Sequence, residues 1–197
     1  NLDYGFQVVQ PDSKYTNAEF EDCSPDIDRI LYVDESRDID FENLGQKIPI
    51  SFKVYKDMSS KRKGKYFELL FEEYCDNMGW KVQDPTNSDH DTRINGKKVE
   101  IKGSLLWGAE GTKFRWQQIR PAQDYEIIVF IAIYPDRIEF YAATKEEVAE
   151  YVQTPNEEGF FIHNQHGGKT KNSGTFFIDG FPKDFPFMHS LDSMVCN

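Results

Sequence analysis

Residues 91–104, DTRINGKKVEIKGS, carry the pattern from which the rest of the fold can be predicted. An Asn-Gly pair at 95–96 lies between two short alternating runs, and both residue types tolerate the positive φ angles of a two-residue turn. We therefore predict an antiparallel hairpin. Because side chains alternate along a strand, Glu100 and Lys102 share one face, and the neighbouring valine and isoleucine take the other, where they can enter a core.

This hairpin also brings acidic residues together. Asp91, on the first strand, can come back across the turn towards Glu100. Two carboxylates and a backbone carbonyl form a hard-oxygen site of the kind that suits Mg²⁺. A lysine beside them, Lys102, can orient water or stabilise charge on a phosphate. The pattern predicts metal-dependent chemistry at a phosphate group.

The spacing of these residues resembles a known family. Asp91, eight further residues and then Glu100-Ile101-Lys102 resemble the D…(D/E)-x-K core of the PD-(D/E)xK nucleases, which have the restriction-endonuclease-like fold. The family usually has a proline directly before the aspartate, whereas here Pro85 lies six residues upstream. The resemblance implies that Asp91, Glu100 and the Ile101 carbonyl hold Mg²⁺, for which Mn²⁺ can substitute. It also implies that Lys102 positions or activates the attacking water.

Two neighbouring residues leave alternatives open. Asp89 is the rival of Asp91 as metal ligand, and we prefer Asp91 because it lies nearer the turn and begins the strand pairing. His90 is interpreted as a loop residue, because the family that the pattern resembles normally uses no histidine base.

Residues 59–80 have apolar side chains at helical spacing, which predicts a helix that begins at a serine and ends at Gly79. Within it, residues 64–68, GKYFE, resemble the G-x-x-x-E opening of the first helix in junction resolvases and many restriction enzymes. The resemblance implies that Glu68 faces the metal site and supports a metal-bound water or a second ion. The alternative is a solvated helix carboxylate.

The remaining core elements follow in the sequence. Residues 125–134 are an almost continuous apolar run rich in β-branched side chains, which predicts a central strand buried on both faces. Residues 137–142 alternate and are expected to be its hairpin partner. Residues 144–147 form a capping box that opens a helix to about Val152. The elements predict an α/β fold in which a mixed β-sheet is flanked by helices, as in a restriction-endonuclease-like core.

Two polar segments carry donors suited to phosphates and base edges. Residues 114–120 are expected to be a short helical or extended segment, and the resemblance places one of its two glutamines near the active site without deciding which. Residues 163–174 form a polar loop that is either a DNA-recognition loop or an ordinary hairpin tip, between expected strands at 160–162 and 175–178. The candidate DNA-binding residues are Arg115, Gln117, Gln118, Arg120, Lys169, Lys171 and Asn172.

The charge is unevenly distributed along the 197 residues. The net charge is −11, but residues 1–56 carry −6, residues 57–120 carry +2 and residues 121–197 carry −7. The basic block contains the hairpin, and a phosphate-binding surface needs local positive potential rather than a positive total. We expect an acidic arm or small subdomain over 1–56, with strands near 30–33 and 48–54, and a nuclease domain over 57–197.

These observations favour one function and leave rivals. We expect a Mg²⁺-dependent endonuclease of double-stranded DNA, most similar to a type II restriction enzyme and acting as a homodimer. A Holliday-junction resolvase or DNA-repair nuclease is the alternative, and a DNA mimic or non-catalytic interaction protein is less favoured, since a mimic would spread carboxylates over one surface. Three cysteines without metal spacing, and no apolar stretch of membrane-spanning length, favour a cytoplasmic location without membrane association.

Overall fold

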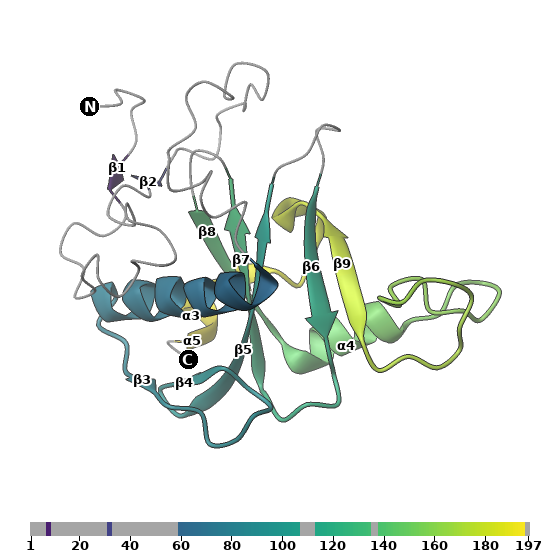
Figure 1. The fold of residues 1–197 in the computed structure, drawn as a ribbon, viewed down its shortest axis with the longest axis horizontal. Helices are drawn as coiled ribbons and strands as arrows, with labels where there is room; N and C mark the ends of the chain where they lie inside the picture. The colour runs from purple at the N-terminus through teal and green to yellow at the C-terminus, as the bar shows by residue number, and fades with distance from the viewer. Residues whose placement is uncertain (1–6, 9–30, 33–58, 107–112, 135–137, 196–197) are drawn as a thin grey trace, which may run out of the picture.

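The structure is a computed structural model that describes residues 7–8, 31–32, 59–106, 113–134 and 138–195 (Figure 1). In the N-terminal part, β1 (Gln7–Val8) and β2 (Leu31–Tyr32) pair antiparallel. The second of these lies within the strand expected at 30–33. The strand expected at 48–54 and most of the proposed arm lie outside the described residues.

A six-stranded mixed sheet forms the centre of the molecule, with the strand order β10-β8-β7-β5-β4-β3. Only the pair β5–β7 is parallel, and every other neighbouring pair is antiparallel. The sheet is therefore mixed, as predicted. Its strands are β3 (Val82–Gln83), β4 (Thr92–Ile94), β5 (Lys97–Leu105), β7 (Ile127–Ile133), β8 (Ile138–Thr144) and β10 (His189–Ser190).

The β4–β5 hairpin turns at the residues that the sequence indicated. Asn95 and Gly96 have φ angles of 49° and 87°, the left-handed conformation that a two-residue hairpin turn requires. β7 follows as the parallel neighbour of β5, and all seven of its residues are buried. A strand covered on both faces by protein has this uniform burial.

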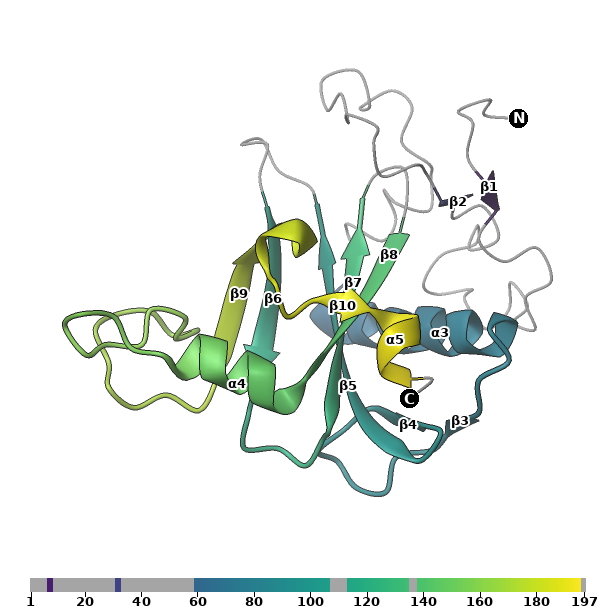
Figure 2. The same cartoon turned by 180° about the vertical axis from the view of Figure 1, so that it is seen from behind.

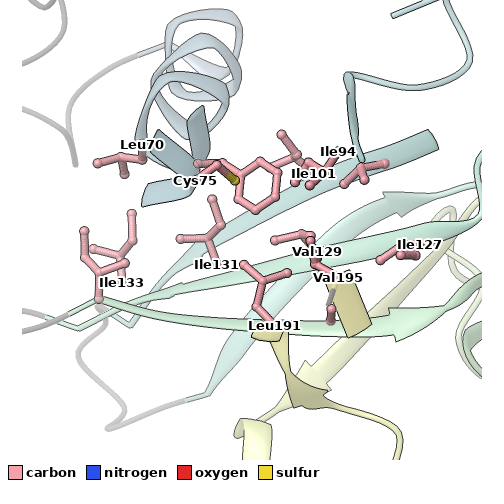
Figure 3. Packing of buried hydrophobic residues seen from close by; sticks show 14 of the residues in the cluster. Leu70, Cys75, Ile94, Ile101, Ile127, Val129, Ile131, Ile133, Leu191 and Val195 are labelled. Carbon is pink, nitrogen blue, oxygen red and sulfur yellow. The ribbon is translucent and has the colours of Figure 1, made fainter. Parts of the chain in front are cut away.

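Helix α3 (Ser60–Asn77) covers one face of the sheet (Figure 1). Its apolar side packs Leu70, Phe71 and Cys75 onto residues of β5 and β7, and α5 (Leu191–Val195) contributes to the same cluster (Figure 3). Gly79, with φ of 72°, follows the helix as predicted. No helix in the described part of the chain is long and apolar enough to cross a membrane.

The other face of the sheet is covered by a second, smaller sheet and by a helix (Figure 2). The two strands of this sheet, β6 (Phe114–Ile119) and β9 (Phe176–Gly180), pair antiparallel although about sixty residues separate them in sequence. Residues 114–120 were expected to be either helical or extended, and 114–119 form a strand. Trp116 fixes the layer to the main sheet, because its indole N–H donates to the Ile131 carbonyl at 3.2 Å.

Helix α4 (Lys145–Gln153) begins where the capping box predicts. The Thr144 hydroxyl accepts from the Glu147 N–H, and the Glu147 carboxylate accepts from the Thr144 N–H. These two bonds satisfy donors that the first turn of any helix leaves open. The helix then buries Val148 and Val152 in the second core cluster.

The strand expected at residues 160–162 is wrong. These residues lie in a loop, and β9 pairs with β6 instead of forming a hairpin with them. The Phe161 N–H donates to the Thr170 carbonyl at 2.9 Å, and Ile162 points outward with 59% of its surface exposed. The chain reaches the free edge of β9 only further along, where Asn164 forms an isolated bridge with Phe176, so residues 160–162 gain no strand pairing.

Candidate active site

The candidate site lies where β4 leaves the edge of β5. The ladder between these strands pairs Thr92 with Val99 as its last position, so β5 continues beyond the end of β4. The Asp91 N–H still donates to the Val99 carbonyl at 3.0 Å. Two residues further along β5, at Ile101, no strand pairs with this edge, and a side chain accepts the backbone hydrogen bond instead.

The side chain of Asp91 replaces the missing strand. Its Oδ2 accepts a hydrogen bond from the Ile101 N–H at 2.7 Å, which holds the carboxylate against the edge of β5. The N–H and the carbonyl of one strand residue point to the same edge, so the Ile101 carbonyl faces the side of β5 on which Asp91 lies. By contrast, Asp89 is in the preceding loop, where its N–H donates to Asn87 Oδ1 at 2.9 Å.

Glu100 and Lys102 lie together on one face of β5, as predicted. Lys102 Nζ donates to Glu100 Oε1 at 2.5 Å, and only 15% and 10% of the two side chains is exposed. Burial is the largest influence on Glu100 and raises the pKa of its carboxyl. The Lys102 ammonium lowers that pKa and the Asp91 carboxylate raises it, and the result lies above the ordinary value of 4.5.

The donor atoms of this cluster fit a hard divalent cation. Lys102 binds Oε1 of Glu100 and Ile101 binds Oδ2 of Asp91, which leaves one oxygen of each carboxylate for a cation. Because the two carboxylates repel and Glu100 is poorly hydrated, positive charge between them would be favourable. In the described part of the chain no group of three or more His, Cys, Asp or Glu side chains could hold a metal. A site made of the two carboxylates and the Ile101 carbonyl, completed by water, stays a prediction.

Glu68 lies on α3, which packs closely on β5. An added Cβ at Gly103 would lie 2.0 Å from the ring of Phe67, so only glycine allows the helix to sit this close. Glu68 accepts a hydrogen bond from Lys65 Nζ at 3.1 Å. The structure therefore places Glu68 beside a cation, and its contact with the metal-binding oxygens stays a prediction.

The sequence indicated Lys65 only as one of several bases before Glu68 that could reach a phosphate backbone or keep the helix soluble. Burial is the largest influence on its ammonium and lowers the pKa, but the carboxylates of Glu68, Glu72 and Asp91 together raise it above 10.5. Lys65 is thus within electrostatic range of Asp91. The signal in the sequence was its place one turn before Glu68 in a run of bases, a pattern that also suits a solvated helix.

His90 has a structural role in the loop before Asp91. Its ring is buried, and Nε2 accepts the Thr86 N–H at 3.1 Å. An accepting Nε2 places the ring proton of a neutral histidine on Nδ1. This agrees with its interpretation as a loop residue.

The candidate DNA-binding residues of β6 fall into two groups. Arg120 is exposed and lowers the pKa of Glu100, so it lies within electrostatic range of the carboxylate pair. Gln117 and Gln118 are also exposed. Arg115, however, is bound to Asp179 by two hydrogen bonds of 2.6 and 2.8 Å. Its guanidinium would have to leave this partner to contact a phosphate.

The other candidates lie in the 154–175 segment, the residues between α4 and β9. Figures 1 and 2 show this segment projecting from the side of the molecule opposite β3 and β4. Lys169 is paired with Glu158 at 2.8 Å, and both Lys169 and Lys171 lie over the ring of Phe160. The Asn172 N–H donates to the Thr170 hydroxyl. The structure does not bring these residues next to the carboxylate pair, and their contact with DNA stays a prediction.

Comparison with known proteins identifies no family. No protein-family model matches the chain, and none of the curated proteins matches it. Among the solved structures that match is a bacterial homing endonuclease, I-Ssp6803I. It is 18% identical in sequence, the match covers 70% of this chain and 92% of that chain, and the TM-score is 0.42. A TM-score of this size transfers neither a site nor a substrate to this chain.

Proposed function

We propose that the chain is a Mg²⁺-dependent endonuclease that hydrolyses phosphodiester bonds of double-stranded DNA, and that its sheet and helices form a restriction-endonuclease-like core. One observation carries the proposal. The bond from the Ile101 N–H to Asp91 holds a carboxylate at the open edge of β5, in electrostatic contact with Glu100 and therefore beside its partner Lys102. Two acidic oxygens, a carbonyl and an ammonium at one strand edge suit hydrolysis at a phosphate.

Each residue of the site has a stated role in this proposal. Asp91, Glu100 and the Ile101 carbonyl would hold the ion. When bound, Mg²⁺ or its substitute Mn²⁺ would polarise a phosphate oxygen and lower the pKa of a coordinated water. Lys102, fixed against Glu100, would place its side chain where water meets the phosphate. Glu68 would accept hydrogen bonds from a metal-bound water.

The reaction itself is a hydrolysis. A water oxygen forms a bond to phosphorus, and one ester P–O bond breaks. One proton of the water passes to the leaving oxygen, and the other is released with the new phosphate monoester. The role of Lys102 is to stabilise the negative charge that develops on the phosphate oxygens, since a preorganised ammonium in a partly buried site needs no reorientation during the step.

Two further cations extend from opposite sides of this site. Lys65 on α3 is within electrostatic range of Asp91, and Arg120 after β6 is within range of Glu100. Phosphates that flank the cut position are the groups such cations bind. These two residues would hold the DNA backbone across the carboxylate pair, while the metal ligands act on the phosphate between them.

Within nucleases we infer a sequence-specific, type II restriction enzyme. Exposed amides on β6 and the polar 154–175 segment are suited to base edges, which a structure-selective junction resolvase or a repair nuclease would not need. A palindromic target cut in both strands requires two sites, so the active species would be a homodimer with two-fold symmetry.

Digestion of a supercoiled plasmid tests this proposal. With Mg²⁺ or Mn²⁺ the protein should give discrete fragments, and sequencing should find one short sequence at every end. EDTA should stop the reaction. Discrete cutting of a four-way junction in preference to duplex would favour the resolvase, and intact plasmid with every ion would contradict the nuclease. Asp91→Asn protein purified in parallel controls for contaminating nucleases.

A further inference from the structure

Strand β6 contains a bulge beside the candidate active site. Between Trp116, opposite Ile178, and Ile119, opposite Phe176, the strand advances three residues while its partner β9 advances two. The extra residue breaks the ladder, as bulges do. Gln118 there has φ of 58°, a left-handed conformation that costs a residue with a Cβ about 1 kcal/mol. Strain of this kind persists only where surrounding contacts hold it.

The contact that holds the bulge is a side chain from the 154–175 segment. The Gln118 N–H, which the interrupted ladder does not satisfy, donates to Gln165 Oε1 at 2.5 Å. This hydrogen bond ties the bulge to the 154–175 segment and spans forty-seven residues of sequence. Without it, the N–H would have to find another acceptor or the bulge would relax.

Gln165 is itself fixed by the backbone around it. Its N–H donates to the Thr175 carbonyl at 3.0 Å, and the preceding residue, Asn164, forms a bridge with Phe176 of β9. Asn164 is buried and its amide donates to the Gly167 carbonyl at 2.7 Å. The acceptor that meets Gln118 is therefore carried on a turn that is locked to the edge of β9.

The bulge sets the direction of two amide side chains. Gln117 and Gln118 are both exposed, whereas the flanking Trp116 and Ile119 are completely buried. A regular strand would alternate, so one of the two glutamines would point into the core. Arg120, which is within electrostatic range of Glu100, follows directly after the bulge. Both amides are thus presented to solvent, three and two residues before Arg120.

We propose that Gln165 is a positioning residue for base recognition: it holds the β6 bulge so that Gln117 and Gln118 reach base edges next to the cut phosphate. Glutamine amides pair with adenine through one donor and one acceptor, and such a pair distinguishes bases by about 1–3 kcal/mol. This inference rests on the proposed nuclease function. In this inference the 154–175 segment does not contact the bases itself but holds the bulge that carries Gln117 and Gln118.

The test compares two substitutions of Gln165 on a randomised duplex library in Mg²⁺, with sequencing of all ends. Gln165→Met has a similar length but no acceptor, and Gln165→Glu keeps an acceptor oxygen. Base preference next to the cut should fall about tenfold or more in Gln165→Met, with total cleavage within about twofold of wild type, because one recognition pair is worth that much. Gln165→Glu should keep the preference. Gln153→Met, at the exposed end of α4, is the control and should change neither quantity.

Hydrogen exchange of the Gln118 amide gives a readout that does not need cleavage. It should quicken in Gln165→Met and stay slow in Gln165→Glu. Unchanged base preference or unchanged exchange in Gln165→Met overturns the inference, as does a wild type that cuts without base preference. A wild type that cuts no DNA with any divalent ion instead defeats the nuclease proposal itself.

Discussion

Two lysine–glutamate pairs in this protein have nearly the same contact distance and very different surroundings. Lys102 and Glu100 on β5 are 2.5 Å apart with 15% and 10% of their side chains exposed, whereas Lys169 and Glu158 in the 154–175 segment are 2.8 Å apart with 71% and 60% exposed. An exposed pair is screened by water and typically contributes less than about 1 kcal/mol. The distance between lysine and glutamate alone therefore does not distinguish a candidate active site from an ordinary exposed ion pair.

The Lys102–Glu100 pair differs from the Lys169–Glu158 pair in two ways: a second carboxylate lies beside it, and it is buried from solvent. Asp91 is bound to the edge of β5 beside Glu100, and burial raises the pKa of Glu100 despite its lysine. The 154–175 segment instead places Lys169 over the ring of Phe160. A bound cation would offset the repulsion between the carboxylates of Asp91 and Glu100. The exposed Lys169–Glu158 pair has no such repulsion for a cation to offset.

Lys102→Ala is expected to have a large effect on cleavage. Removal of the ammonium should lower the single-turnover cleavage rate by about 10²–10³-fold, the usual cost of one group that stabilises charge in the transition state. DNA affinity should stay near that of wild type, because many phosphate contacts contribute to it. Lys183→Ala, an exposed lysine outside the site, is the matched control. A Lys102→Ala protein that cuts at the wild-type rate would remove lysine from the site.

Asp91→Asn should abolish the stabilisation that Mg²⁺ gives to the fold. At about one hundred times its dissociation constant, Mg²⁺ should stabilise the wild type by about 2.7 kcal/mol against unfolding. The asparagine oxygen can still accept the Ile101 N–H, so the metal-free fold should survive. Calorimetry measures both quantities, and Asp89→Asn should bind Mg²⁺ like wild type. Loss of binding in Asp89→Asn alone would exchange the roles of the two aspartates.

Gly103→Ala tests the close approach of α3 to β5. A Cβ at this position would overlap the Phe67 ring, so the substitution should cost about 1–3 kcal/mol of stability, the range for an overpacked core. Gly64→Ala, in α3 itself and with open space around it, should instead raise stability by up to about 1 kcal/mol. Denaturant unfolding measures both. Similar effects for the two alanines would mean that the helix does not depend on the close approach.

The smallest effect concerns pH without metal. Because the pKa of Glu100 is raised on folding, the folded state holds this proton over a range above 4.5 in which the unfolded state has lost it. Stability should therefore fall as pH rises through that window, and Glu100→Gln should remove this part of the slope. Urea unfolding at a series of pH values, without divalent ions, measures it. A slope unchanged by the substitution would contradict the raised pKa.

Local patterns predicted much of the fold correctly. The Asn95-Gly96 turn, the buried strand β7 and the capping box at Thr144 were all visible, because each depends on residues close together in sequence. The hairpin also predicted the approach of Asp91 to β5, since a two-residue turn fixes which residues lie opposite each other.

Contacts between distant segments could not be predicted. The pairing of β6 with β9 joins residues about sixty positions apart, and residues 160–162, expected to be a strand, lie in a loop. Because of that pairing, Arg115 binds Asp179 and the Gln118 N–H donates to Gln165. An alternating or apolar run indicates a strand but not its neighbour, so the sequence could identify donors without showing which were already engaged.

The central claim is that the buried pair on β5, and not the exposed pair, is where DNA is cut. It is tested most directly by single-turnover cleavage in Mg²⁺ with Glu100→Gln and Glu158→Gln. The account predicts that Glu100→Gln lowers the rate by about a thousandfold or more while DNA stays bound, since a lost metal ligand removes several kcal/mol of transition-state stabilisation. Glu158→Gln should cut within about twofold of wild type. Equal rates for the two variants would contradict the account.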